Sequence, residues 1–183
     1  MNELQDYLAT NPPMRETVAG YLIRNGERGE EVLLGERTRV SDGLGHGIIA
    51  SIGGGIEDGE SPDEALEREV QEEIRIRITT YRKVGRVVCL SPHRPSWNLG
   101  VDIYLVTDFE GEPEKTEDID PHWYPKDELP LDRMWLDNRI TAPLVLAGKR
   151  IAGSFLYDAD GQIVEQHLRE LAQGEPIPAI ATQ

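Results

Sequence analysis

The chain has 183 residues, and its 34 acidic and 19 basic side chains give a formal net charge of −15. This charge argues against DNA or RNA polymers as partners, because phosphate backbones are bound by clustered Lys and Arg. No apolar run approaches the ~20 residues that span a bilayer, and no apolar segment typical of a signal peptide opens the sequence. We therefore expect a cytoplasmic protein without membrane contact, built as a single domain over residues 1–183.

Alternating apolar residues and turn-forming residues mark the expected strands. Residues 1–14 are an N-terminal arm, either a short docking helix or a frayed end. Strands are expected at 17–24, 31–37, 48–52, 77–82, 84–90, 100–107, 122–124, 151–157 and 163–168. Helices are expected from Ser61 onward and at 137–148, and an irregular tail at 172–183. Strands and helices are mixed without regular alternation, which favours an α/β fold with a mixed β-sheet between helices.

The start of the first long helix is clearly marked in the sequence. Ser61 is a good N-cap residue, Pro62 suits the first helical position, and Glu64 completes a capping box. A glycine-rich loop, residues 53–59, directly precedes it. The chain is therefore expected to turn sharply before residue 61 and to continue as a helix.

Three glutamates of this helix, Glu69, Glu72 and Glu73, have the spacing i, i+3, i+4, which places their carboxylates on one face. Like charges this close oppose folding unless something positive lies among them, and Mg²⁺ or Ca²⁺ prefers such oxygen ligands. A solvated acidic helix is the alternative, and Glu-rich helices in general favour it. The glycine loop, the Arg68–Glu69 pair and the Glu72–Glu73 pair occur together at fixed spacings, which favours a metal site.

The segment resembles the Nudix box, a glycine loop followed by a helix with Arg-Glu and Glu-Glu pairs. The matching positions are Gly54, Glu60, Arg68, Glu69, Val70, Glu72, Glu73 and Ile76. Arg75 stands where the family has Gly, and a left-handed helix end there costs a non-Gly residue ~1 kcal/mol. The resemblance implies a Nudix-type α/β/α sandwich and a hydrolase that cleaves a nucleoside diphosphate linkage with Mg²⁺, or Mn²⁺, as cofactor.

The resemblance also implies roles for individual residues. The metal ligands would be Glu69, Glu72, Glu73, the carbonyl of Gly53 and an acid from a later loop, Asp118 or its neighbour Glu117. The catalytic set would be Glu72, Glu73 and Arg68, with Arg68, like Glu60, mainly bracing the loop against the helix. Arg37 matches a position where relatives contact substrate phosphate. The alternatives are a surface acid at Asp118 and an ordinary surface arginine at Arg37.

Both flanks of the box look like the MutT-homologue branch, which hydrolyses oxidised purine nucleoside triphosphates to monophosphate and pyrophosphate. In that branch Trp135 would stack on the base, and Asp137 and Asn138 would read its edge. Packing alone is the alternative for Trp135, and helix capping is the alternative for Asp137. Relatives have an Asn and aromatic residues where this chain has Ala50, Cys89 and Ser91. Triphosphate cleavage is therefore better supported than selectivity for an oxidised base.

Two other functions stay open. Pro92 lies 16 residues after Ile76, a spacing seen in the ADP-ribose pyrophosphatase branch, so an ADP-ribose or nucleotide-sugar pyrophosphatase is the second candidate. A non-catalytic nucleotide-sensing domain is the third, although the intact set of carboxylates argues against it. We expect a small-molecule nucleotide as the partner, and the sequence leaves open whether the protein is a homodimer.

Overall fold

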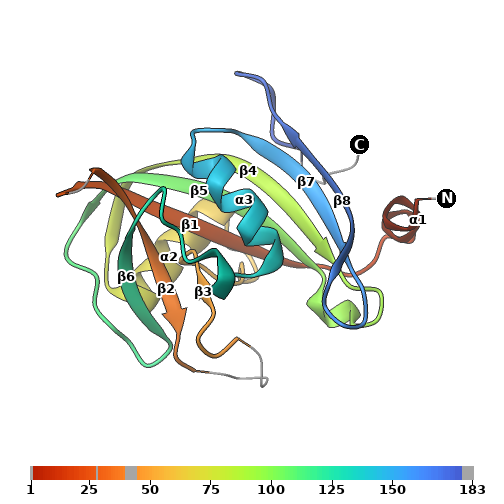
Figure 1. The fold of residues 1–183 in the computed structure, drawn as a ribbon, viewed down its shortest axis with the longest axis horizontal. Coiled ribbons are helices and arrows are strands. Elements are labelled where there is room, and N and C mark those ends of the chain that lie inside the picture. The colour runs from red at the N-terminus through yellow and green to blue at the C-terminus, as the bar shows by residue number, and fades with distance from the viewer. Residues whose placement is uncertain (1, 28, 40–44, 179–183) are drawn as a thin grey trace.

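The computed structural model describes residues 2–27, 29–39 and 45–178 (Figure 1). Eight strands of these residues form one sheet. Seven of them follow the order β3-β2-β1-β5-β4-β7-β8, and β6, which lies off this path, pairs with β2. The strands are β1 Arg15–Gly26, β2 Gly29–Arg37, β3 Ile49–Ala50, β4 Arg77–Leu90, β5 Leu99–Glu110, β6 Ile119–Pro125, β7 Ile151–Tyr157 and β8 Ile163–Glu170. The β1–β5 and β4–β7 pairs are parallel and the other pairs are antiparallel, so the sheet is mixed.

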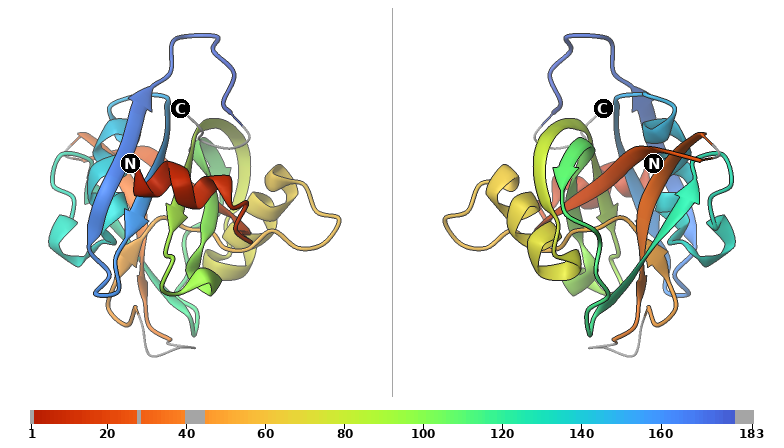
Figure 2. Two further views of the ribbon diagram at one scale, coloured as in Figure 1. Left: turned by 90° about the vertical axis from the view of Figure 1, so that its right-hand side faces the viewer. Right: turned by 90° about the vertical axis from the view of Figure 1, so that its left-hand side faces the viewer.

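Helices cover both faces of this sheet (Figure 2). Helix α2, Pro62–Ile74, packs Leu66 and Val70 onto one face, in a core that includes Leu22 of β1. Helix α3, Leu136–Leu146, packs Ala142 and Val145 onto the other face. Two short 3₁₀ turns, η1 Pro95–Trp97 and η2 Leu131–Arg133, lie in the connections. The expected α/β/α sandwich with a mixed sheet is confirmed.

The N-terminal arm forms the docking helix α1, Glu3–Ala9. The Asn2 side chain caps it by accepting the Gln5 N–H, and Leu4 is fully buried against a cluster formed by β4 and β7. The frayed alternative is wrong because this apolar contact anchors the arm. The tail after β8 is irregular as far as residue 178, and residues 179–183 lie outside the described part. Among the described residues, no helix is long and apolar enough to cross a membrane.

Two strand predictions needed correction. β4 is one strand from Arg77 to Leu90, not two runs at 77–82 and 84–90. Its pairing with β5 shifts register between Ile78 and Tyr81 and again between Lys83 and Gly85, and such bulges change the alternation of side chains without ending the strand. The strand expected at 48–52 shortens to β3, because Ile52 makes an isolated bridge to Gly20 of β1.

Candidate active site

Helix α2 begins and ends with defined caps, and these caps hold its carboxylates in place. Ser61 accepts the Glu64 N–H while the Glu64 side chain accepts the Ser61 N–H, which completes the expected capping box. The helix ends at Arg75, which adopts the left-handed conformation with φ 63° and donates its N–H to the Gln71 carbonyl. The helix end is therefore preserved without glycine, at the backbone cost described above.

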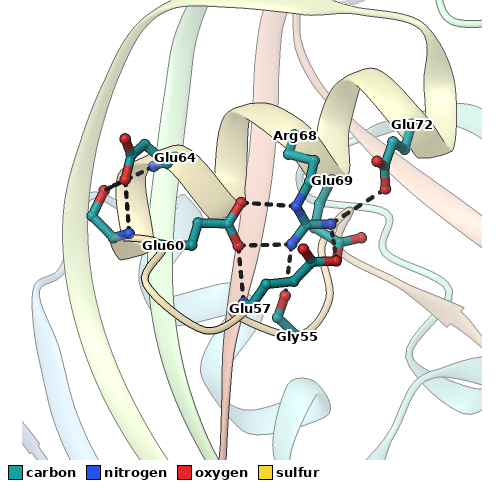
Figure 3. Close-up of polar contacts among 8 residues, drawn as sticks. Gly55, Glu57, Glu60, Glu64, Arg68, Glu69 and Glu72 are labelled. Atoms are coloured by element: carbon teal, nitrogen blue, oxygen red, sulfur yellow. Dashed lines mark hydrogen bonds and ion pairs between the residues drawn. The ribbon is translucent and has the colours of Figure 1, made fainter.

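Arg68 is the centre of a network that ties the preceding loop to the helix (Figure 3). Its Nε donates to Glu60 at 2.8 Å, and its Nη2 donates to Glu60 and to the Gly55 carbonyl at 2.9 and 2.8 Å. Its Nη1 pairs with Glu69 at 2.8 Å and with Glu72 at 3.3 Å. Hydrogen bonds from this guanidinium lower the pKa of Glu60 to about 2. Arg68 therefore braces the loop and is also the positive group among the helix carboxylates.

Of the three helix glutamates, Glu73 is the most buried, and the glycine-rich loop holds its side chain. Its Oε2 accepts the Gly53 N–H at 3.0 Å. A Cβ at Gly53 would lie only 2.1 Å from the Val18 carbonyl oxygen, so this close approach of two backbone segments requires glycine. Burial raises the pKa of Glu73 to about 7 and also raises the pKa of Glu69. Glu73 thus carries a proton over a range in which an exposed glutamate is ionised.

The three helix glutamates meet residues from two other segments in a hollow of about 230 Å³, which we call the acidic hollow. Its lining residues are Arg37, Arg39, Glu69, Glu72, Glu73 and Asp118. Arg39 contacts Asp118 at 3.7 Å and Glu117 at 3.4 Å. The structure thus brings the sequence-predicted Arg37 and Asp118 to the helix carboxylates. Sequence reasoning missed Arg39, although its spacing of two from Arg37 puts both side chains on one side of an extended chain.

Within residues 2–27, 29–39 and 45–178, no three His, Cys, Asp or Glu side chains are already arranged to hold a metal ion. The contacts present explain this. Arg68 engages Glu69 and Glu72, and the Gly53 N–H engages Glu73. The donor set is nevertheless made of carboxylate oxygens, which hard divalent cations prefer, and 61% of the Glu72 side chain is exposed to solvent.

A second hollow, of about 180 Å³, leads from Arg37 to the start of helix α3; we call it the nucleoside cleft. Its lining also includes Gly53, Ala50, Trp135, Asp137 and Asn138. Arg37 lines both hollows. Arg37 therefore adjoins both the acidic residues and the predicted base-binding residues.

Asp137 is held by a side chain that the sequence did not point to. The Tyr157 hydroxyl donates to its Oδ1 at 2.9 Å, and the thiol of Cys89 lies 3.7 Å from its Oδ2. Burial raises the pKa of Asp137 and of the Cys89 thiol. The N-cap position of α3 belongs to Trp135, which makes no side-chain capping bond, so Asp137 does not cap this helix. No local spacing links Tyr157 to a position 20 residues earlier.

Known proteins share both the sequence and the fold. The NUDIX domain family model matches residues 14–145. An oxidized purine nucleoside triphosphate hydrolase of Danio rerio is 32% identical over 140 residues, covering 76% of this chain and 87% of the relative. The Mus musculus protein of the same name is 30% identical over 142 residues, covering 78% and 88%.

Among solved structures, a MutT mutator protein from Bacillus halodurans aligns with a TM-score of 0.71 at 23% identity, covering 85% of this chain and 97% of that one. At this identity the likeness shows the fold alone. Nudix hydrolases generally use a divalent metal and act on small nucleotide substrates, which agrees with the two hollows. The family match over residues 14–145, with the relatives of similar length, shows that this chain belongs to the NUDIX family and is a Nudix hydrolase.

Proposed function

We propose that the protein hydrolyses purine nucleoside triphosphates, oxidised ones included, to the monophosphate and pyrophosphate, and so removes damaged nucleotides from the pool. The observation that carries this proposal is that Arg37 lines both the acidic hollow and the nucleoside cleft. The acidic hollow offers carboxylates, and the nucleoside cleft offers the Trp135 ring beside two short polar side chains, Asp137 and Asn138. The names of the Danio rerio and Mus musculus relatives, both oxidized purine nucleoside triphosphate hydrolases, support the same substrate class.

The residues that would hold Mg²⁺, or Mn²⁺ in its place, are Glu69, Glu72, Glu73, Asp118 and the carbonyl of Gly53. When bound, the ion neutralises charge on the phosphates and activates a water molecule. Arg68 pairs with Glu69 and Glu72 in the metal-free protein. Both carboxylates would therefore have to leave Arg68 to bind a cation. Arg68 then holds Glu60 and the Gly55 carbonyl and keeps the loop in register with the helix.

The chain's own residues divide the remaining work. Burial raises the pKa of Glu73 to about 7 in the metal-free protein, and a bound cation would favour the ionised form, which can accept a proton from water. Glu72 faces solvent and is the second catalytic carboxylate. Arg37 draws the phosphates toward the acidic hollow, where negative charge would otherwise repel them. Trp135 stacks on the purine, and Asp137 and Asn138 form hydrogen bonds with its edge.

A nucleotide panel tests the proposal. Release of pyrophosphate or phosphate is measured from dGTP, 8-oxo-dGTP, 2-oxo-dATP and ADP-ribose, with Mg²⁺ and with a chelator. We expect Mg²⁺-dependent turnover of the triphosphates and the highest kcat/KM for a purine. A preference for ADP-ribose would establish the pyrophosphatase alternative, and no turnover of any compound would favour nucleotide sensing. In the same assay Glu73→Gln should lower turnover by about two to four orders of magnitude. Glu64→Gln is the matched control, because Glu64 lies on the same helix and, in the part of the chain that the structure describes, its side chain bonds within the capping box alone.

A further inference from the structure

A hollow of about 560 Å³ adjoins the nucleoside cleft, and Trp135 and Asp137 line both. In the proposed function this hollow is part of the base-binding region. One of its walls comes from the connection between β4 and β5, which contributes Ser91, Arg94 and Trp97. We call residues 91–98 of this connection the base loop. The position of the base loop therefore decides the shape of the space that receives the purine.

One buried side chain, Asn98, joins the two ends of the base loop. Asn98 is 1% exposed, and its Oδ1 accepts the Ser91 N–H at 2.8 Å. Its backbone N–H donates to the Pro95 carbonyl at 3.1 Å and closes the turn η1, which carries Trp97. The first residue of the loop is thus bonded to the last, and Ser91 and Trp97 are fixed relative to each other.

The other hydrogen bonds of the Asn98 amide go to the N-terminal arm. Its Nδ2 donates to the Tyr7 hydroxyl at 3.0 Å and to the Pro13 carbonyl at 3.2 Å. An amide side chain has two N–H donors, so both have a partner. The backbone carbonyl of Asn98 accepts the Arg15 N–H at 3.0 Å, where the arm enters β1. The base loop is therefore fastened to the arm through Asn98.

Helix α1 of the arm is itself fixed to the sheet. Leu4 is fully buried against β4 and β7, and its N–H donates to Glu165 of β8 at 3.1 Å. The Tyr7 ring packs against the same apolar cluster, while its hydroxyl meets Asn98. The NUDIX family model matches from residue 14 onward, so α1 lies outside the matched domain. This chain thus braces the base loop with an element that precedes the family's own segment.

On the basis of the proposed function, we propose that Tyr7 and Asn98 are positioning residues, through which the N-terminal arm holds the base loop and sets the affinity for the purine. A wall that is ordered before the nucleotide arrives loses little freedom on binding. Once the brace is removed, the nucleotide has to order the loop, and KM rises. The carboxylates of α2 are held separately, by Arg68 and the Gly53 N–H, so kcat stays unchanged.

The test measures kcat and KM for dGTP in saturating Mg²⁺. Tyr7→Phe keeps the ring and removes only the hydroxyl. It should raise KM roughly 2- to 12-fold, the factor that corresponds to one neutral hydrogen bond, with kcat within twofold of wild type. Asn98→Ala should raise KM further, because it also releases Ser91. If that variant does not fold, Tyr7→Phe alone decides.

Tyr81→Phe is the matched control, and it should keep the wild-type KM. Its hydroxyl donates to Glu67 at 2.6 Å, and neither residue belongs to the arm or to the base loop. Amide hydrogen exchange followed by NMR adds a readout that is independent of turnover. The Ser91 N–H should exchange faster with solvent in Tyr7→Phe than in the wild type or in Tyr81→Phe.

The outcomes separate this inference from the proposed function. An unchanged KM in Tyr7→Phe, a fall in kcat as large as the rise in KM, or a raised KM with unchanged exchange at Ser91 overturns the inference and leaves triphosphate cleavage standing. If the wild type hydrolyses no nucleotide, the proposed function fails, and the Kd of dGTP from tryptophan fluorescence decides the inference. Weaker binding to Tyr7→Phe than to Tyr81→Phe supports the brace, and equal binding refutes it.

Discussion

Replacing Glu73 by Gln should stabilise the metal-free protein while removing its activity. Burial raises the pKa of Glu73 from 4.5 to about 7. The folded protein therefore keeps a proton that the unfolded chain releases between these pH values, so stability falls as the pH rises through this window. At ~1.4 kcal/mol per pH unit, ionising the buried carboxylate costs roughly 3 kcal/mol above pH 7. Glutamine avoids this cost and still offers an oxygen to the Gly53 N–H.

Thermal unfolding of both proteins at pH 4 and pH 8, with a chelator present, measures the effect. We expect similar Tm values for the two proteins at pH 4. At pH 8 the variant should melt about 6–12 °C higher, at ~2–4 °C per kcal/mol for a chain of this size. Saturating Mg²⁺ should narrow the gap, because the wild type gains stability by binding the ion. If the difference in Tm between the variant and the wild type is no larger at pH 8 than at pH 4, the assigned burial of Glu73 is refuted.

Three other substitutions test separate parts of the structure. Trp135→Ala should raise KM by roughly one to two orders of magnitude in steady-state kinetics through lost stacking, and a KM within twofold of wild type would contradict this. Asp137→Ala should narrow the difference in kcat/KM between 8-oxo-dGTP and dGTP more than it weakens both, and an unchanged ratio would remove Asp137 from base recognition. Arg75→Gly should raise Tm by about 1–4 °C, because glycine relieves ~0.5–1 kcal/mol of strain at φ 63°; a lower Tm would show that the Arg75 side chain contributes more than the strain costs.

The features that could be predicted from sequence depend on neighbours along the chain. The capping box at Ser61 and the spacing of Glu69, Glu72 and Glu73 are properties of one helix, so they specify its start and its acidic face directly. The apolar face of the same helix, with Leu66 and Val70, could likewise be predicted to pack against the core. Arg68 could be paired with Glu72 at four residues, because that contact is made within a single helical turn.

The features that could not be predicted depend on long-range packing. Tyr157 reaches Asp137 only because β7 lies beside β4 in the sheet, beneath the start of α3. The bulges in β4 arise from its pairing with β5 and shift the alternation of side chains, so one strand resembled two. The hollow of about 560 Å³ that Trp97, Trp135 and Asp158 line likewise depends on long-range packing, because the segments that surround it are far apart in the sequence.

The products of triphosphate hydrolysis test the central claim most directly. Phosphorus NMR of 8-oxo-dGTP incubated with the protein and Mg²⁺, beside the Glu73→Gln variant, identifies them. We predict 8-oxo-dGMP and pyrophosphate from the wild type, and a rate about two to four orders of magnitude lower from the variant. A nucleoside diphosphate with inorganic phosphate, or near-normal turnover by Glu73→Gln, would contradict the assignment of this cleft and its carboxylates.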